Sequence, residues 1–385
     1  MNDETSNKLK LFYNLQKSSE GDYFPDQVLR NIDLEYYLSG NKDICKPLYI
    51  TWNITNSCNL NCFFCSARAK HCKEPIKNSS TLKIANKIIK SECVYISLLG
   101  GEPTLNTDIL ECVKLFNSHH IFTEIVTNGV GINEHFVEEI CKLEKSLIRI
   151  KLSLDSCNEE VNDKIRGKGA FRLVKDALRL LASKDLNTRL QMVVCENNKN
   201  DILSTYKFAQ ENNCKSFGFS FVMPIGRGIQ LKPVKINEGI VDQLIEIKKF
   251  EKTCKLQKFG FGIDGFEYFK SLNAVKDSGG IDLSRLKCSA CRYRLNLDEN
   301  GDIYPCDMLR FPEFKLGNIL KCNKLSNIFN KKVSKKIRQL SLRQNKLECK
   351  NCKNTWCNTG CLGMCIEHYK SKGIMLPMCR IGEEN

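Results

Sequence analysis

Short apolar runs alternate with amphipathic stretches between residues 48 and 225. The runs of strand length lie at 48–54, 94–99, 123–127, 147–154, 189–194 and 216–222. Between them, apolar positions recur at the spacing of one helix face, at 80–91, 106–118, 134–144, 171–183 and 201–212. This alternation predicts βαβ units built around a parallel sheet.

Six such repeats predict an α/β fold with a partial, TIM-like (βα)6 barrel, because a closed barrel of this type needs eight. We divide the chain into an N-terminal cap segment at 1–47, the barrel at 48–228, a bridging region at 229–285 with a helix at 237–252, and a small cysteine-rich domain at 286–385. In barrels of this kind the chemistry lies at the carboxyl ends of the strands.

The composition is that of a soluble globular protein. The chain has 385 residues, of which 42% are apolar and 27% charged. No apolar run approaches the roughly 18 residues of a membrane span, and the N-terminus lacks the apolar core of a secretory signal, so we expect a cytoplasmic protein. The net charge of +15 suits an acidic peptide or a nucleic acid. The chain has no compact Lys/Arg block with interleaved aromatics, so nucleic acid is the weaker of these two interpretations.

The 22 cysteines need an explanation, because dense cysteine in a reducing cytosol more often indicates metal than disulfides. Eleven of them fall in motifs described below. The others are scattered and are interpreted as small buried fillers: Cys45, Cys72, Cys93, Cys112, Cys141, Cys157, Cys195, Cys214, Cys254, Cys322 and Cys365.

Three cysteines lie within eight residues directly after the first predicted strand. Cys58, Cys62 and Cys65 place three sulfurs on one loop, and no fourth ligand has a standard spacing. His71 and Cys72 are near, but no known spacing includes them. The arrangement therefore predicts three ligands and one open coordination position, and a structural zinc loop is the alternative.

The spacing Cys-x3-Cys-x2-Cys resembles that of the radical S-adenosylmethionine (radical SAM) enzymes. The resemblance implies a 4Fe–4S cluster whose open iron binds SAM, with Phe64 near the adenine. Gly100, Gly101, Glu102 and Pro103 follow the second strand and match the family's GGEP motif, which binds the SAM amino group. An ordinary strand–helix turn is the alternative for this tetrapeptide alone.

The same resemblance assigns further SAM contacts to the ends of later strands. Thr127 and Asn128 follow the third strand, and Ser153 and Asp155 follow the fourth; similar positions contact the SAM ribose or carboxylate. Arg166 matches an arginine that pairs with the SAM carboxylate. Each of these residues, taken alone, also fits an ordinary turn or surface position. The segment 224–228, Pro-Ile-Gly-Arg-Gly, resembles the family's pattern without an assigned role.

The last hundred residues resemble the SPASM extension of peptide- and protein-modifying radical SAM enzymes. Cysteines bracket a predicted hairpin at 296–304, which has Asn-Gly in its turn. The resemblance implies two auxiliary 4Fe–4S clusters, giving three clusters in all, and a zinc ribbon is the alternative. The first cluster would use Cys288, Cys291, Cys306 and Cys361, with Cys291 the less certain of the early pair, and the second Cys349, Cys352, Cys357 and Cys379, with Cys365 as an alternative to Cys379.

The resemblance implies a radical SAM oxidoreductase that modifies a ribosomally made peptide by thioether or carbon–carbon crosslinks. An anaerobic sulfatase-maturing enzyme, which forms formylglycine, is the alternative, and Asp307 is a candidate base in both. Expected partners are the peptide or protein substrate and a low-potential donor of the flavodoxin or ferredoxin type. A separate leader-binding protein is a further alternative. A non-enzymatic zinc- or nucleic-acid-binding protein would leave residues 100–103 unexplained.

Overall fold

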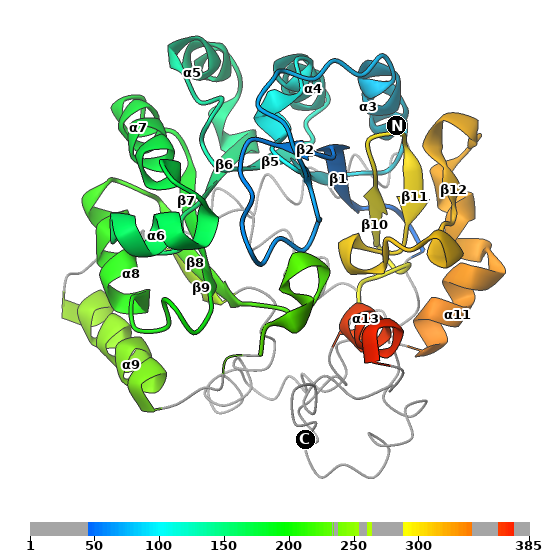
Figure 1. Cartoon of the computed structure of the whole chain (residues 1–385). Coiled ribbons are helices and arrows are strands. Elements are labelled where there is room, and N and C mark those ends of the chain that lie inside the picture. Colours follow the sequence, from blue (N-terminus) through cyan, green and yellow to red (C-terminus); the bar gives the residue numbers. More distant parts are fainter. Residues whose placement is uncertain are drawn as a thin grey trace.

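A ten-stranded sheet organises the protein (Figure 1). The computed structural model describes residues 45–232, 234, 238–253, 260–263, 288–340 and 361–372. The strand order is β12-β11-β10-β1-β4-β5-β6-β7-β8-β9. The strands are β1 Tyr49–Thr55, β4 Tyr95–Gly100, β5 Phe122–Thr127, β6 Ile148–Ser153, β7 Thr188–Val194, β8 Ser216–Phe221, β9 Gly260–Ile263, β10 Arg294–Leu297, β11 Asp302–Tyr304 and β12 Gly317–Asn318.

The six predicted barrel strands are confirmed, and they pair in parallel in sequence order from β1 through β4 to β8. Strand β9, within the predicted bridging region, adds a further parallel strand beside β8. The fold is therefore the expected α/β partial barrel, with the carboxyl ends of its parallel strands gathered at one edge.

Helices lie on the outer side of the curved sheet, and the strands lie inside them (Figure 1). The predicted helices are confirmed, and so is the bridging helix α9. The helices of the barrel and bridge are α3 Thr81–Ile89, α4 Ile109–Ser118, α5 Glu134–Cys141, α6 Glu159–Arg166, α7 Ala170–Ser183, α8 Ile202–Glu211 and α9 Glu238–Thr253.

Helix α6 is absent from our sequence predictions because it is short and strongly polar. Its local signals are nevertheless present. The Asn158 side chain accepts hydrogen bonds from the N–H groups of Glu160 and Val161 and so caps the helix. The helix ends at Gly167, whose φ of 120° suits glycine.

The predicted hairpin is confirmed as antiparallel strands β10 and β11, followed by β12. Strand β10 also pairs in parallel with β1, from Tyr49↔Arg294 to Trp52↔Leu297. The sheet therefore continues from the barrel into the cysteine-rich region. Two helices follow, α11 Lys332–Leu340 and α13 Leu362–Lys372, together with the short 3₁₀ segments η5 Asp307–Leu309, η6 Pro312–Phe314, η7 Ile319–Lys321 and η8 Leu325–Asn330.

The two faces of the sheet differ in chemistry. Side chains that face the helices form one large apolar core. Polar side chains alternate with them along the strands and are also buried; they include Thr51, Asn53, Ser97, Glu124, Arg149 and Gln191. Glu124 and Arg149 form a buried ion pair, with 2.7 Å between Arg149 Nε and Glu124 Oε2. The interior of a barrel is usually filled with branched apolar residues, so this polar lining is unusual.

Several predictions from the sequence fall on residues that lie outside the described ranges. These are the cap segment at 1–44, most of residues 254–287, and the cysteines at 349, 352, 357 and 379. Within the described ranges, no helix combines the length and the apolar character needed to cross a membrane.

Trp52 joins the barrel to the hairpin. Its side chain is fully buried, packs edge-on against Phe116 at 6.5 Å between ring centroids, and donates from Nε1 to the Asp298 carbonyl at 3.2 Å. It thus contacts a helix of the barrel and the turn between β10 and β11. Removing it would leave a large cavity between the two parts.

Trp52→Ala should lower the free energy of unfolding by about 3–5 kcal/mol, because a buried aromatic side chain is replaced by a cavity. Urea unfolding followed by circular dichroism measures this change. Leu82→Ala is the control; Leu82 is 40% exposed, so we expect a change within about 0.5 kcal/mol. Equal effects of the two substitutions on the free energy of unfolding would contradict the role of Trp52 in joining the barrel to the hairpin.

Candidate radical SAM site

The three-cysteine loop leaves the carboxyl end of β1 and is closed at its base. Strand β2 (Ser57–Cys58) pairs in parallel with β3 (Lys70–His71). The Cys72 N–H donates to the Cys58 carbonyl and the Lys70 N–H to the Asn56 carbonyl, both at 2.8 Å. Between these two strands the chain makes an excursion that carries Cys62 and Cys65.

Cys58, Cys62 and Cys65 pack in one small apolar cluster, with Cys58 buried and the other two half-buried. Burial raises the pKa of the Cys58 thiol to about 12 and also raises the pKa of Cys62, although Arg166 and Arg227 oppose the shift at Cys62. A buried thiolate needs a compensating cation, and a bound metal supplies one. The donor set and its burial therefore fit an iron–sulfur cluster bound through three thiolates.

Among the described residues, no three His, Cys, Asp or Glu side chains converge closely enough to hold a single metal ion. The loop holds its three thiols near one another without directing them at one point. His71 is exposed on β3, and the Cys72 thiol is 3.7 Å from the Glu74 carbonyl.

Gly100 and Gly101 pack against the backbone at the start of the cysteine loop. Gly100 is the last residue of β4, and Gly101 follows it. The Gly101 N–H donates to the Thr55 carbonyl and the Glu102 N–H to the Ser57 carbonyl, both at 2.8 Å. A Cβ at Gly100 would lie 2.2 Å from the Thr55 oxygen, and one at Gly101 would lie 2.0 Å from the Ser57 oxygen. In the structure these glycines allow close approach of two backbone segments.

Glu102 is buried and joins the loops after β4 and β5. Its Oε1 accepts hydrogen bonds from Thr104 N (3.0 Å), Thr104 Oγ1 (2.6 Å) and Thr127 Oγ1 (2.6 Å), and its Oε2 accepts one from Asn128 N (2.8 Å). Four internal donors thus already use the carboxylate for which the sequence suggested an amine. Pro103 begins the 3₁₀ segment η1, Pro103–Leu105, directly after it.

Asn128 connects this network to the cysteine loop. Its Nδ2 donates to Asn59 Oδ1 at 2.8 Å and lies 3.8 Å from Cys58 Sγ. The structure therefore brings the predicted residues Glu102, Thr127 and Asn128 together beside Cys58. We infer that the GGEP segment orders the loop through its hydrogen bonds as well as through its glycines.

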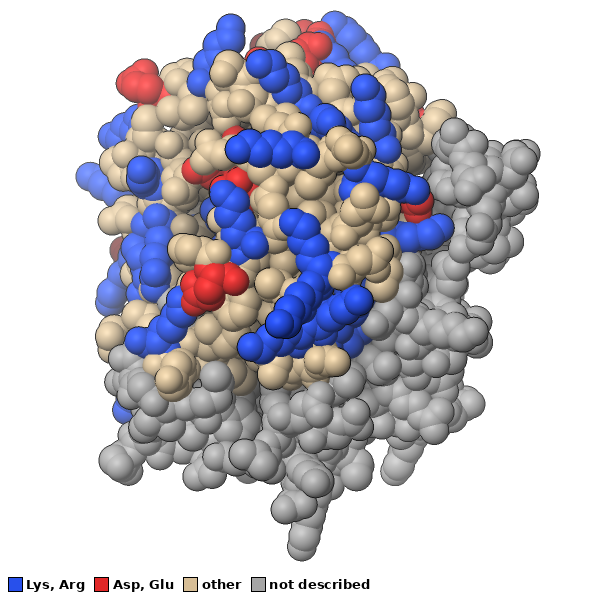
Figure 2. Space-filling model, turned by 90° about the vertical axis from the view of Figure 1, so that its right-hand side faces the viewer, with Lys and Arg blue, Asp and Glu red and all other residues tan. Residues whose placement is uncertain are grey.

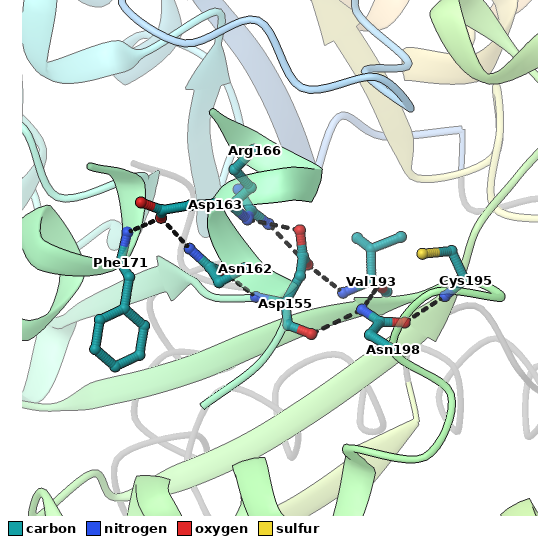
Figure 3. A network of polar contacts seen from close by, with 8 residues as sticks. All are labelled: Asp155, Asn162, Asp163, Arg166, Phe171, Val193, Cys195 and Asn198. Carbon is teal, nitrogen blue, oxygen red and sulfur yellow. Dashed lines mark hydrogen bonds and ion pairs between the residues drawn. The ribbon is translucent and has the colours of Figure 1, made fainter. Parts of the chain in front are cut away.

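Asp155 and Arg166 form a buried ion pair near the same loop (Figure 3). Arg166 Nε lies 2.6 Å from Asp155 Oδ2, and Arg166 Nη2 donates to Asp155 Oδ1 at 3.0 Å. Asp155 Oδ1 also accepts from the Val193 N–H at 2.8 Å. The Arg166 guanidinium lies over the Phe64 ring, 5.8 Å from its centroid. The fork of Arg166, predicted to bind the SAM carboxylate, is thus paired with Asp155.

Two asparagines that the sequence analysis missed hold Asp155 in place (Figure 3). Asn162 Oδ1 accepts from the Asp155 N–H at 3.0 Å, and Asn198 Nδ2 donates to the Asp155 carbonyl at 2.7 Å. Asn198 also accepts from the Cys195 N–H at 2.7 Å. Asn198 has one sequence signal, its position after a predicted strand, and Asn162 lies in α6, which the sequence did not predict. Ser153, at the end of β6, is half-buried.

Among the described auxiliary cysteines, Cys306 and Cys291 both have Cys288 as an electrostatic neighbour. Cys288 and Cys361 both contribute to the raised pKa of the Cys306 thiol, whose largest cause is burial. The Cys291 thiol is buried and hydrogen-bonded with the Ser334 side chain, and burial raises its pKa to about 12. Cys365 is buried in α13, one turn after Cys361.

Asp307 lies far from the three-cysteine loop. Its Oδ1 accepts a 2.6 Å hydrogen bond from Arg294 Nη2, and the Arg294 guanidinium lies 4.9 Å from the Tyr49 ring centroid. Tyr49 begins β1, whereas the loop follows its end at Thr55. Seven residues of strand separate the two places by roughly 20 Å. The structure therefore does not bring Asp307 next to the three cysteines.

Comparison with known proteins identifies the class. The radical SAM superfamily matches residues 52–209, and the iron–sulfur cluster-binding SPASM domain matches residues 288–353. The chain therefore belongs to the radical SAM enzymes and carries a SPASM domain.

Two relatives and one solved structure illustrate the similarity. Mycofactocin maturase MftC of Mycolicibacterium smegmatis is 27% identical over 323 residues, covering 82% of this chain and 78% of MftC. The cysteine-type anaerobic sulfatase-maturating enzyme of Clostridium novyi is 26% identical, covering 80% and 85%. The structure of Streptococcus suis SuiB bound to S-adenosylmethionine has a TM-score of 0.69 at 20% identity, covering 94% and 84%.

Asp155→Asn should lower the free energy of unfolding by about 3–5 kcal/mol, because the buried Arg166 charge loses its partner. Chemical denaturation of the wild type and the variant at pH 7 measures the difference. Glu159→Gln is the matched control, since Glu159 pairs with Arg172 in the solvent, and we expect at most about 0.5 kcal/mol there. Comparable losses in both variants would show that the Asp155 pair is not special.

Proposed function

We propose that this enzyme uses SAM to modify a ribosomally synthesised peptide, forming thioether or carbon–carbon crosslinks. The observation that carries the proposal is the junction of two predicted motifs. The N–H groups of Gly101 and Glu102 bind the backbone of Thr55 and Ser57, immediately before Cys58. The motif for the SAM amino group and the three-cysteine loop thus form one structure at the carboxyl ends of β1 and β4.

A 4Fe–4S cluster bound by Cys58, Cys62 and Cys65 would supply the electron that cleaves SAM to a 5′-deoxyadenosyl radical. The chain's own residues would hold SAM beside it: Phe64, Gly100, Gly101, Glu102, Pro103, Thr127, Asn128, Ser153, Asp155 and Arg166. Because Asp155 and Arg166 pair with each other, we propose that Arg166 contacts SAM while its guanidinium stays paired with Asp155. The polar inner face of the sheet, with Asn53, Ser97 and Gln191, suits a peptide backbone better than an apolar substrate.

The cysteine-rich region would hold two further clusters, which would accept the one electron that the substrate radical gives up after hydrogen-atom abstraction. We propose Cys288, Cys306 and Cys361 for the first, with Cys291, whose thiol is hydrogen-bonded with the Ser334 side chain, as the less certain fourth ligand. The proposed ligands of the second, Cys349, Cys352, Cys357 and either Cys379 or Cys365, lie mostly outside the described residues. Cys288, Cys306 and Cys361, here called the Cys306 group, lie near the amino end of β1. The substrate would therefore occupy the barrel interior between the three-cysteine loop and the Cys306 group.

Formylglycine formation, as the name of the Clostridium novyi relative suggests, is the second candidate. Asp307 beside Cys306 is a candidate base for both reactions, so it does not decide between them. The two candidates differ in product: a crosslinked peptide loses two hydrogen atoms per bond, whereas formylglycine carries a new aldehyde.

Anaerobic reconstitution should load about twelve irons per chain and permit SAM cleavage under reductant, because three clusters of four irons are expected. Cys58→Ala, Cys62→Ala and Cys65→Ala together should remove about four irons and abolish SAM cleavage. The control combines Cys112→Ala, Cys141→Ala and Cys214→Ala, which lie on or beside helices α4, α5 and α8. Iron analysis and chromatography of 5′-deoxyadenosine provide the measurement.

Bound zinc without iron, or SAM cleavage that survives the first triple substitution, would contradict the assignment. A precursor peptide encoded beside the gene is the substrate to test, and mass spectrometry of its product distinguishes a crosslink from formylglycine. A neighbouring sulfatase gene would instead favour formylglycine formation.

We propose that a low-potential, acidic donor of the flavodoxin or ferredoxin type docks on a lysine-rich face formed by α3 and residues 321–336. Residues 315–340 contain no Asp or Glu, and their exposed lysines are Lys315, Lys321, Lys324, Lys331, Lys332, Lys335 and Lys336. Helix α3 adds Lys83 and Lys90 and the exposed Leu82. Figure 2 shows basic side chains far outnumbering acidic ones on the side where α3, β12 and α11 lie in Figure 1.

Lys332→Glu, Lys335→Glu and Lys336→Glu together should slow donor-dependent SAM cleavage about tenfold or more at low salt, because electrostatic steering is lost. The difference should shrink above ~0.1 M salt, where the Debye length falls to about 10 Å. Cleavage driven by a small chemical reductant should stay unchanged. The control reverses Lys168, Lys175 and Lys184 to Glu; an equal loss there would exclude a specific docking face.

A further inference from the structure

The segment 224–228, Pro-Ile-Gly-Arg-Gly, is the sequence motif to which the proposed reaction gives no role. It follows β8, and its second half forms the 3₁₀ segment η3, Gly226–Gln230. In the sheet, β8 lies five strands away from β1. The segment that follows β8 nevertheless contacts the three-cysteine loop that follows β1. These two loops therefore bridge the open side of the barrel at the carboxyl ends of the strands.

Arg227 makes this contact through the backbone of the cysteine loop. Its Nε donates to the Cys62 carbonyl and its Nη1 to the Ala69 carbonyl, both at 2.9 Å. Its own N–H donates to the Cys65 carbonyl at 3.0 Å. One residue thus binds three carbonyls that are distributed along the excursion between β2 and β3.

The neighbouring glycines make this approach possible. Gly226 has φ of 61°, and a Cβ there would lie 2.5 Å from the carbonyl oxygens of both Cys65 and Ser66. A Cβ at Gly228 would lie 3.3 Å from the Phe64 oxygen. The segment is therefore shaped to lie directly on the loop backbone, and any larger residue at 226 would displace it.

The other backbone hydrogen bonds of the loop at this end are longer than those of Arg227. The loop's internal turns are long, with 3.3 Å from Cys65 N to the Cys62 oxygen and 3.3 Å from Arg68 N to the Cys65 oxygen. The Phe63 N–H reaches the Ile165 carbonyl at 3.4 Å. The three bonds from Arg227 are shorter than all of these, so we expect them to dominate the order of residues 62–69.

The positive charge of the Arg227 guanidinium also lies beside the three-cysteine loop. Within the described part of the chain, no carboxylate lies within ion-pair distance of its guanidinium, whereas Arg166 is paired with Asp155. The positive charge therefore acts mainly on its nearest anionic neighbours, the thiolates that the loop would present to iron. Such a charge favours the addition of an electron nearby.

We propose that Arg227 is a positioning residue, which holds the backbone of the three-cysteine loop in place and offsets the negative charge of the thiolates. The inference rests on the proposed function only in so far as the loop binds a cluster. The hold on the loop is a property of the polypeptide and can be tested without iron.

The first experiment compares hydrogen–deuterium exchange of residues 59–69 in the iron-free and the reconstituted protein. Arg227→Gln should speed exchange about tenfold or more, because two side-chain hydrogen bonds are lost. Arg227→Lys should give a smaller increase, since an ammonium lacks the planar fork that spans two carbonyls. Arg172→Gln is the matched control at an exposed arginine, and its exchange should equal that of the wild type.

The second experiment follows the charge. A redox titration of the paramagnetic signal that responds to added SAM should give a more negative midpoint for Arg227→Gln, while Arg227→Lys should remain near the wild type. SAM affinity should fall in Arg227→Gln more than in Arg227→Lys. An unchanged midpoint in Arg227→Gln would overturn the electrostatic part of the proposal.

Exchange in Arg227→Gln equal to that of the wild type would overturn the positioning role. If Arg227→Gln fails to fold, as judged by circular dichroism, Gly226→Ala takes its place: the added Cβ should displace the loop and speed its exchange with the guanidinium intact. A wild-type protein that binds no iron would refute the proposed function, and the exchange data on the iron-free chain would still decide the role of Arg227.

Discussion

The pairing of β1 on both of its edges is the constraint on which the rest of the structure depends. One edge binds β4, which ends in the GGEP segment, and the other binds β10, which begins the cysteine-rich region. The strand thereby fixes the three-cysteine loop at its carboxyl end and the Arg294–Asp307 pair at its amino end. Trp52, in the middle of the same strand, joins both neighbours through the core and the Asp298 carbonyl.

Loops that carry chemistry are ordered here by buried polar groups. Glu102 accepts four hydrogen bonds from two neighbouring loops, and the fully buried Asp155 carboxylate is bound by Arg166 and by the Val193 N–H. Buried carboxylates are tolerated only when fully hydrogen-bonded or paired. Each of these two carboxylates therefore marks a place where the backbone of a loop is held rigidly. A radical reaction needs such rigidity, because its reactants must be kept in place.

The two ends of the barrel divide the chemistry. SAM cleavage would occur at the carboxyl ends of the strands, where the loops after β1, β4, β5, β6 and β8 meet. The Cys306 group, at the amino end of β1, would receive electrons from a substrate held in between. The polar inner face of the sheet, with its buried Glu124–Arg149 pair, lies along that path.

Much of this protein followed from local sequence. The six parallel strands, their helices, the β10–β11 hairpin and the three-cysteine loop are encoded by short-range periodicity and spacing, which depend on neighbouring residues alone. Helix α6 was missed because it is short and polar, although Asn158 and Gly167 mark its ends. Cys58, Cys62 and Cys65 could be found because one loop holds all three.

Tertiary structure decided which distant residues meet. Nothing local indicates that Arg166 faces Asp155, that Asn198 holds the Asp155 carbonyl, or that Arg227 binds the loop 165 residues before it. The contacts of Asn198 and Arg227 join loops that follow different strands, so their partners are set by strand order and register. The sequence alone determined the βα repeat and the spacing of the candidate ligands, and only the folded sheet determined the hydrogen bonds and charges around them.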